Sequence, residues 1–213
     1  MKNSKLHGKC ETFYEDGTPM SISTYSDGKQ VGESMKYWEN GKTKSKSVRD
    51  NTGKLSKMFE YYKEGQLQKE SKIENDREIA ATEFFMNGSP KMQFKWVGKQ
   101  KSFVRYHDNG KPELKANLMA ISKCYYSCWD TLEYDGLVER FDEDGSIAEK
   151  SEYKNGELDG KSIRYYPNGK IEQEREYKNN RIVSDKTYNA DGSSEGNTEY
   201  FPDGSKRVNK AKK

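Results

Sequence analysis

The chain has 213 residues, 34% of them charged, and its 38 basic and 35 acidic residues leave a net charge of only +3. Leu, Ile, Val and Phe together number 31, too few for the thick core of an ordinary globular domain of this length. An unfolded polar chain is the bland alternative, but such chains carry few aromatic residues, whereas 12% of this chain is aromatic and its aromatics recur at regular intervals.

Residues 3–8, Asn-Ser-Lys-Leu-His-Gly, match residues 155–160, Asn-Gly-Glu-Leu-Asp-Gly, so the sequence begins in the middle of a repeating unit. We expect either that the first strand is a bare edge strand or that upstream sequence, such as a signal or a linker, precedes Met1. The two cases predict different compartments for the protein. We expect the cytoplasm if Met1 is the native start, and the cell envelope or the exterior if a signal has been removed.

Glycines recur along the chain with a period close to 24 residues. The aligned positions are Gly17, Gly41, Gly65, Gly88, Gly110, Gly145, Gly169 and Gly192. Half-period turns lie between them at Gly28, Gly53, Gly98 and Gly156, with Asp76 and Asn180 in the place of glycine. A fixed period of this length is typical of repeat proteins. Each half-period of about 12 residues holds one strand and one turn, so a full repeat is a β-hairpin.

The turn sequences predict antiparallel pairing. Pro167-Asn168-Gly169 and Pro202-Asp203-Gly204 place proline where φ must be negative and glycine where φ must be positive, as in a type I turn closed by a glycine bulge. No segment has a convincing helical stripe that could form a second layer. The sequence therefore predicts an all-β fold, a meander of about 16–18 antiparallel strands in a mostly single-layer, twisted sheet. We expect one array over residues 1–213, of about nine hairpins, with a non-repetitive insertion at about 115–138.

A three-residue loop also predicts the register of each hairpin, because the residue four before the glycine faces the residue two after it. Six predicted pairs join an aromatic to an apolar residue: Phe13–Pro19, Tyr61–Leu67, Phe84–Pro90, Tyr106–Pro112, Phe141–Ile147 and Tyr165–Ile171. Tyr37–Thr43 and Tyr188–Ser194 are weaker members. The adjacent positions pair Tyr14–Thr18, Trp38–Lys42, His107–Lys111 and Tyr166–Lys170. We expect one aromatic and aliphatic face and one wet, charged face.

The predicted aromatic stripe has two interpretations. Its members are Phe13, Tyr37, Tyr61, Phe84, Tyr106, Phe141 and Tyr165. In the first interpretation these rings fill the trough of a curled sheet. In the second they form a surface that binds a partner, since contiguous exposed apolar area marks interaction sites and tyrosine is favoured at interfaces.

Residues 115–136 interrupt the repeat and form its most apolar stretch, with Cys124, Cys128 and Trp129. This cysteine pair has no nearby histidine and falls short of the four ligands of a structural zinc site. On one strand the two cysteines would lie about 13 Å apart, too far for a disulfide, whereas on a helical turn or loop they could meet. The interruption has three interpretations. It is a structural plug or extended hairpin, or a protrusion that contacts a partner, or a redox or metal site.

Residues 153–169, YKNGELDGKSIRYYPNG, and residues 25–41, YSDGKQVGESMKYWENG, share a pattern of tyrosine, two glycines and an aromatic pair before Asn-Gly. The pattern resembles the MORN-repeat variant of bacterial proteins, many of them labelled YwqK-family antitoxins, and it covers the chain apart from about residues 115–138. The resemblance implies an antiparallel hairpin array, protein binding and, in some members, neutralisation of a partner toxin. The sequence departs from the pattern at Ala80, in the second-glycine position, and at Gly53, which follows a strand without an aromatic.

Other functions find little support in the sequence. His7 and His107 lie beside turns without a serine or cysteine nucleophile in context, and the glycines belong to turns between strands rather than to phosphate-binding loops. We therefore expect no enzyme, no cofactor and no metal site. Nearly matched acidic residues argue against nucleic acid as a partner. No apolar run approaches the length of a transmembrane span, and three cysteines are too few for a disulfide framework.

We predict a non-enzymatic protein-binding repeat scaffold, which the resemblance suggests is an antitoxin or immunity-type protein that occludes a partner toxin. The predicted partner-binding residues are Phe13, Tyr37, Tyr61, Phe84, Tyr106, Trp129, Phe141 and Tyr165. The alternative is a structural or adhesive repeat protein of the cell envelope or the exterior. A homo-oligomer formed through a sheet edge or through the apolar face is a further prediction.

Overall fold

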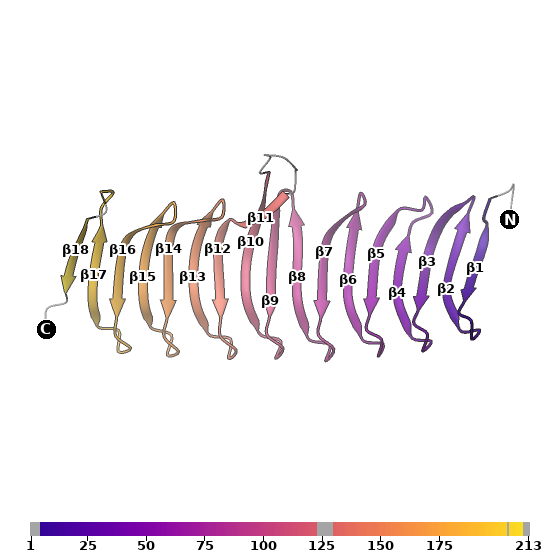
Figure 1. Cartoon of the computed structure of the whole chain (residues 1–213), viewed down its shortest axis with the longest axis horizontal. Helices are drawn as coiled ribbons and strands as arrows, with labels where there is room; N and C mark the ends of the chain where they lie inside the picture. Colours follow the sequence, from indigo (N-terminus) through magenta and orange to yellow (C-terminus); the bar gives the residue numbers. More distant parts are fainter. Residues whose placement is uncertain (1–4, 123–129, 204, 211–213) are drawn as a thin grey trace. The chain divides into compact units, whose positions relative to one another are not determined.

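The computed structural model describes residues 5–122, 130–203 and 205–210. These residues form 18 β-strands and no helix, and successive strands make a meander of antiparallel hairpins (Figure 1). The predicted fold class is therefore confirmed. Residues 1–95 and 96–213 form two compact units. The prediction of a single array over the whole chain stays a prediction.

The first unit is a continuous succession of paired strands (Figure 1). Its strands are β1 (Gly8–Phe13), β2 (Pro19–Ser26), β3 (Lys29–Tyr37), β4 (Thr43–Arg49), β5 (Leu55–Tyr61), β6 (Leu67–Glu74), β7 (Arg77–Phe84) and β8 (Pro90–Val97), the last of which runs into the second unit. Each strand pairs in the antiparallel sense with the next one along the chain.

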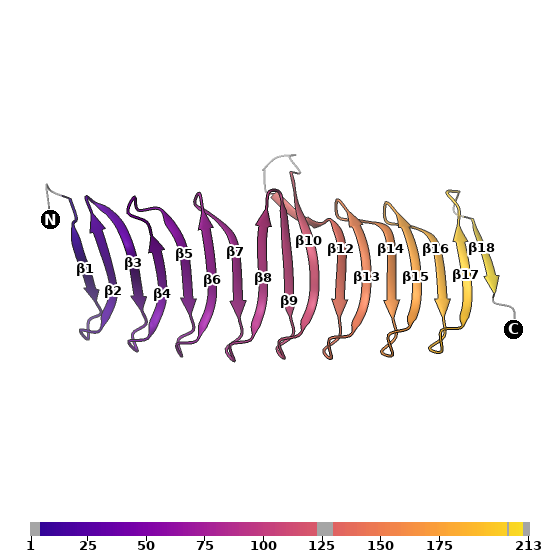
Figure 2. The ribbon, with the colours of Figure 1, turned by 180° about the vertical axis from the view of Figure 1, so that it is seen from behind.

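The second unit follows the same plan with one interruption (Figure 2). Its strands are β9 (Gln100–Tyr106), β10 (Pro112–Ser122), β11 (Asp130–Tyr134), β12 (Gly136–Phe141), β13 (Ile147–Lys154), β14 (Glu157–Tyr165), β15 (Ile171–Lys178), β16 (Arg181–Tyr188), β17 (Ser194–Tyr200) and β18 (Lys206–Lys210). Strand β10 is the longest, with 11 residues. One side of β10 pairs with β9, and the other side pairs first with β12 and then with β11.

The hairpins have different turns at their two ends. At one end, called here the primary-turn edge, the Gly17 N–H donates to the Tyr14 carbonyl and the Tyr14 N–H donates to the Thr18 carbonyl, which closes the predicted three-residue loop with Gly17 at φ +87°. At the other end, the half-period edge, two consecutive residues often have positive φ. Asp76 and Asn180 do so at φ 59° and 60°, which confirms that they stand in the place of glycine.

All eight predicted cross-strand pairs are confirmed. Phe13 faces Pro19, Tyr61 faces Leu67 and Tyr165 faces Ile171, and the other five hairpins follow the same register. A bulge follows each pair on the second strand, so that Thr12 faces Ser21 and Met20 is the extra residue. Because side chains alternate along a strand, this register places all the predicted rings of a unit on one face of its sheet.

The most deeply buried side chains lie on the opposite face. They are Ser71, Ala81, Leu114, Ala116, Val138 and Ser151, none more than 6% exposed. Hydroxyl groups pair between strands on this face, as in the 2.7 Å contact between Ser34 Oγ and Ser47 Oγ. The expectation that this second face is wet was wrong. The small side chains in the middle of the strands let the side chains of neighbouring strands pack over them and exclude water. The polar residue types of this face do not indicate such packing.

Side chains at the primary-turn edge tie each hairpin to the next. The Tyr14 hydroxyl donates to the Tyr37 carbonyl at 2.7 Å, and the Tyr62 hydroxyl donates to the Phe84 carbonyl at 2.9 Å. Lysines do the same at the residue before the turn glycine, since Lys111 Nζ lies 2.6 Å from the Asp144 carbonyl oxygen. These bonds satisfy carbonyls at strand ends and in turns, and they link neighbouring hairpins.

Candidate protein-binding surface

The structure brings the predicted rings into one row in each unit. In the first unit the row holds Phe13, Tyr37, Tyr61 and Phe84, and in the second it holds Tyr106, Phe141 and Tyr165. Phe13 is 55% exposed, and the other six rings are partly buried. Each ring ends its strand beside a primary turn, so the row runs along the primary-turn edge of its unit. Trp129, the remaining predicted residue, lies outside the described residues.

A second apolar row lies beside the first in the first unit. Ile22 faces Met35 across β2 and β3, and Phe59 stands two residues before Tyr61 on the same face of β5. Together these residues form a band two side chains deep, in which Lys46 stands between Met35 and Phe59. We call it the apolar face and define it by its apolar side chains, Phe13, Pro19, Ile22, Met35, Tyr37, Phe59, Tyr61 and Leu67. The main contacts of each described strand in this unit are with its sheet neighbours, and not across this face.

The equivalent second row of the second unit carries more charge, because Lys115, Glu139, Lys150 and Glu174 stand there beside Val104 and Ile163. Lys150 Nζ lies 3.1 Å from Glu139 Oε1, and Lys115 Nζ lies 5.0 Å from the centre of the Phe141 ring. The lysine covers part of the Phe141 ring. The two units therefore differ in the share of apolar side chains in this row. The first unit, with Ile22, Met35 and Phe59, is closer in composition to the core of a protein interface.

The inserted segment forms an extended hairpin in its described part. Strand β11 continues the pairing of β10 from Leu118 opposite Tyr134 to Ser122 opposite Asp130. Of the three expectations for this segment, the extended hairpin is therefore shown for residues 112–122 and 130–134. Cys124 and Cys128 lie outside the described residues, so the partner-contact and redox expectations stay predictions.

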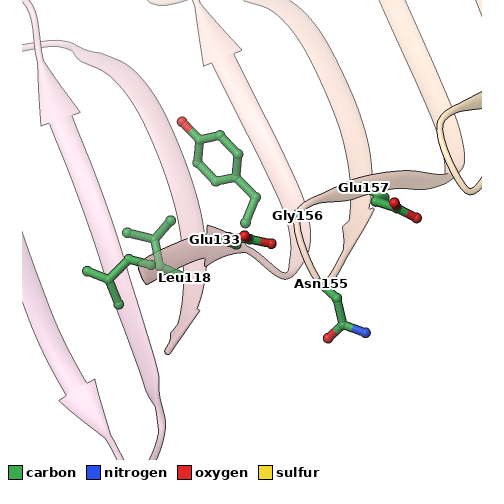
Figure 3. Close-up of a pocket in the computed structure, with 7 residues that line it drawn as sticks. Leu118, Glu133, Asn155, Gly156 and Glu157 are labelled. Atoms are coloured by element: carbon green, nitrogen blue, oxygen red, sulfur yellow. The ribbon is translucent and has the colours of Figure 1, made fainter. Parts of the chain in front are cut away.

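An open cleft of about 530 Å³ lies beside this hairpin (Figure 3). Its lining comes from β10, β11 and the turn between β13 and β14: Leu118, Leu132, Glu133, Tyr134, Asn155, Gly156 and Glu157. The Gly156 N–H donates to the Tyr134 carbonyl at 2.9 Å, which fixes the turn against the end of β11. Figure 3 shows Glu133 beside Gly156, whose missing side chain makes room for the carboxylate. The sequence alone does not reveal this cleft, because its residues come from two hairpins.

Tyr134 lines the packed side of this cleft, and its ring contacts that of Tyr153. The Tyr134 and Tyr153 rings lie 5.2 Å apart at a tilt of 51°, and both pack against the small buried cluster of Leu114, Ala116 and Val138. Burial raises the pKa of the Tyr153 hydroxyl above its ordinary value. The tyrosine that precedes a half-period turn is thus a packing residue here, and the repeated Tyr-x-x-Gly pattern was the signal that could have located it.

The charged side chains of the packed face are largely paired with one another. Arg105 makes two hydrogen bonds of 2.7 Å to the Glu113 carboxylate, and these hold the pKa of Glu113 below its ordinary value. Arg175 Nε lies 3.1 Å from Asp185 Oδ2. Such pairing neutralises the arginines where they stand, so this face offers little attraction for an anionic partner.

The two histidines have structural neighbours. His107 Nε2 lies 3.1 Å from the Phe141 carbonyl oxygen, and so occupies the position that a tyrosine hydroxyl has in other hairpins. His7 Nδ1 lies 3.8 Å from Asp27 Oδ1. Cys10 is a free, partly buried cysteine. Within the described ranges, no three His, Cys, Asp or Glu side chains are grouped so that they could hold a metal ion.

The fold and its period define a repeat protein built from antiparallel hairpins. The model of the MORN repeat variant matches four segments, residues 6–27, 30–51, 134–155 and 158–179. These four matches confirm the MORN-repeat part of the resemblance. The first two lie within the unit that carries the apolar face, and the other two adjoin the cleft. No curated protein matches the chain. Among the described residues there is no helix of the length and hydrophobicity needed to cross a membrane.

Proposed function

We propose that this protein is a non-enzymatic scaffold that binds another protein through the apolar face of its first unit. One observation carries the proposal. The aromatic row with Tyr37 and Tyr61 lies beside a second row that holds Phe59, on a sheet face across which the described strands of the unit make no main contact. Contiguous exposed apolar area of this kind is typical of interaction surfaces.

The composition of the apolar face supports a protein partner. Tyrosine and phenylalanine provide large contact area with few rotatable bonds, and burying such a side chain contributes about 1.5–3 kcal/mol. Lys46 lies within the band, between Met35 and Phe59, and its Nζ is paired with Glu33 Oε1 at 2.6 Å. Aromatic residues and methionine, which are enriched at protein interfaces, surround this paired charge.

The non-enzymatic part of the proposal rests on how the reactive side chains are used. His107, Lys111 and Lys170 bond to backbone carbonyls of the neighbouring turn. Groups held in this way contribute to the spacing of the hairpins, and they are not assembled around a substrate cavity. An assay against general hydrolase and transferase substrates that gave turnover sensitive to these residues would contradict the proposal.

A capture experiment with matched variants tests the binding surface. The purified protein is immobilised, partners are captured from the native host, and Phe59→Ala and Tyr61→Ala are compared with Tyr165→Ala. Tyr61 faces Leu67 and Tyr165 faces Ile171 in the same register, so both tyrosine variants lose the same kind of cross-strand pair. We expect at least tenfold weaker capture for the first two, as for residues at the centre of an interface. Equal capture by all folded variants would rule out the apolar face.

The partner that the resemblance suggests is a toxin whose active site the scaffold occludes. This finer proposal rests on the resemblance of the repeats to antitoxin-labelled proteins. Co-expression with a toxin-like reading frame that neighbours the gene tests it. We expect growth rescue by the wild type and none by Tyr61→Ala; no rescue and no co-purification with the wild type would refute the antitoxin role and leave the binding surface to the capture experiment.

A further inference from the structure

Asn-Gly dipeptides occupy five turns of the chain: Asn40-Gly41, Asn87-Gly88, Asn109-Gly110, Asn155-Gly156 and Asn168-Gly169. An asparagine followed by glycine is reactive in water, because the backbone nitrogen of the glycine can attack the side-chain carbonyl carbon, Cγ, of the asparagine. Glycine favours this attack, since it has no Cβ to hinder the approach and its backbone is permissive. The hydrogen bonds of each turn then decide which of the five asparagines is free to react.

At the primary-turn edge, hydrogen bonds hold the asparagine amide in place. Asn168 Oδ1 accepts the N–H of the residue two positions on at 3.0 Å, and its Nδ2 donates to a carbonyl of the next primary turn at 2.8 Å. Asn40 and Asn109 make the same two bonds. Asn87 Oδ1 accepts bonds from both the N–H and the hydroxyl of Ser89. These bonds fix Cγ and must break before the glycine nitrogen can reach it.

Asn155 stands in a half-period turn, where its amide lacks such bonds. Its side chain is exposed, bonds to none of the described residues, and is directed away from Glu133 and Glu157 (Figure 3). The Gly156 N–H donates to the Tyr134 carbonyl at 2.9 Å. The glycine N–H is bonded to a carbonyl at the other four sites too, so this bond does not distinguish them. Of the five asparagines, Asn155 is therefore the one whose Cγ is least restrained.

We propose that Asn155 is a site of spontaneous modification, at which water converts the asparagine to aspartate and isoaspartate. Hydroxide removes the Gly156 N–H proton, and the nitrogen forms a bond to Asn155 Cγ. Nδ2 leaves as ammonia, which yields a five-membered succinimide. Water then opens this ring at either of its carbonyl carbons. The site lies in the second unit and is independent of the apolar face.

The isoaspartate product changes the turn itself. When water opens the ring at the main-chain carbonyl carbon, the backbone runs through Cβ and Cγ, which adds one atom to a two-residue turn. The Gly156 N–H then no longer points at the Tyr134 carbonyl, and the turn between β13 and β14 loses this bond to β11. The modification therefore loosens the turn that lines one side of the cleft.

Peptide mapping by mass spectrometry tests the proposal, after incubation of the full chain at mildly alkaline pH. We expect amide loss at Asn155 to be at least tenfold faster than at Asn40, Asn109 and Asn168, because its side chain has no hydrogen bonds to break. In urea the five rates should converge to within about threefold, since the structure is lost and glycine follows every one of these asparagines. Equal rates in the folded chain, or an advantage of Asn155 that persists in urea, would overturn the proposal.

The turn of Asn179 and Asn180 provides a matched variant. Asn179 has φ 47°, against 50° for Asn155, and its side-chain amide bonds to none of the described residues, but asparagine and not glycine follows it. Asn180→Gly supplies the glycine at a position whose φ of 60° suits it. We expect amide loss at Asn179 to rise at least tenfold in this variant, with Asn168 unchanged. No rise at Asn179 would contradict the proposal; should Asn180→Gly fold poorly, the comparison of the five wild-type sites decides it.

Hydrogen exchange measures the loosening of the turn. The isoaspartate form of the chain is separated by ion exchange and compared with the unmodified form. We expect the Gly156 amide to exchange at least tenfold faster in the isoaspartate form, because its bond to Tyr134 is lost, while the Gly169 amide keeps its rate. An unchanged rate at Gly156 would refute the loosening.

Discussion

The Tyr166 hydroxyl donates a hydrogen bond of 2.8 Å to the backbone carbonyl of Tyr188, which ends the neighbouring β16. Tyr14 and Tyr62 make the same bond to the corresponding carbonyls of their own neighbours. Where the second aromatic of the pair is a tyrosine, as at these three positions, it ties one hairpin to the next, while the first aromatic faces the opposite side of the sheet. In a repeat protein, stability is approximately a sum over such neighbour contacts.

Tyr166→Phe removes this bond and leaves the ring in place. We expect the free energy of unfolding to fall by about 0.5–1.5 kcal/mol, since the Tyr188 carbonyl loses its donor. Denaturant titration monitored by circular dichroism measures the change. Tyr165→Phe is the matched control, because the Tyr165 hydroxyl bonds to none of the described residues, and a loss of equal size there would contradict the tie.

Trp38 occupies the tying position of its hairpin, but its buried indole Nε1 has no hydrogen-bond partner among the described residues. Lys44 Nζ lies 4.5 Å from the centre of its ring. We expect Trp38→Tyr to be more stable than Trp38→Phe by about 1 kcal/mol, because a tyrosine hydroxyl can reach the Tyr61 carbonyl as its counterparts do. Thermal unfolding of the two variants decides the point, and equal stabilities would show that the carbonyl is out of reach.

Gly156→Ala should destabilise the second unit more than Gly169→Ala does. Both glycines have positive φ, +83° and +79°, which costs an alanine about 1 kcal/mol at either position. A Cβ at Gly156 would also overlap the Glu133 carboxylate, whereas a Cβ at Gly169 meets nothing within 4 Å. We expect an extra loss of about 1–2 kcal/mol at Gly156. The double variant Gly156→Ala with Glu133→Ala should recover most of that extra loss, and no recovery would refute the steric cause.

Acid should weaken the primary turns. Hydrogen bonds from the Ser146 hydroxyl and N–H lower the pKa of Asp144 from its ordinary 3.8, and serines do the same for Asp191. A lowered folded pKa gives stability that is present above the unfolded pKa and is lost as pH falls through the folded pKa. We expect Tm to fall between about pH 4 and pH 2, where these carboxylates become protonated.

The variant Asp144→Asn isolates one turn from this acid effect. An amide oxygen can accept the same two bonds without titrating, as Asn87 does from Ser89. We expect a smaller decrease of Tm below about pH 4 in Asp144→Asn than in the wild type. Glu143→Gln is the control, since the Glu143 side chain makes no hydrogen bond to the described residues. An identical pH profile for the wild type and Asp144→Asn would exclude the turn carboxylate as a source of the acid effect.

The hairpins and their register could be predicted from the sequence because both depend on residues close together in the chain. A glycine in a three-residue loop fixes which residues face each other, so the pairs of Phe13 with Pro19 and of Tyr165 with Ile171 followed from spacing alone. The same local rule placed the rings of each unit on one face. It could not show which face is packed, because burial depends on neighbours one or two hairpins away.

By itself, then, the sequence determined the strands, the turns, the register and the repeat, all of them consequences of local backbone geometry and side-chain alternation. Only the tertiary structure decided that Ser71 and Ser151 are buried, that tyrosine hydroxyls bond to the next hairpin, and that a cleft lies beside β11. These features arise where hairpins meet, and the contacts there join residues 20 or more positions apart that no turn sequence specifies.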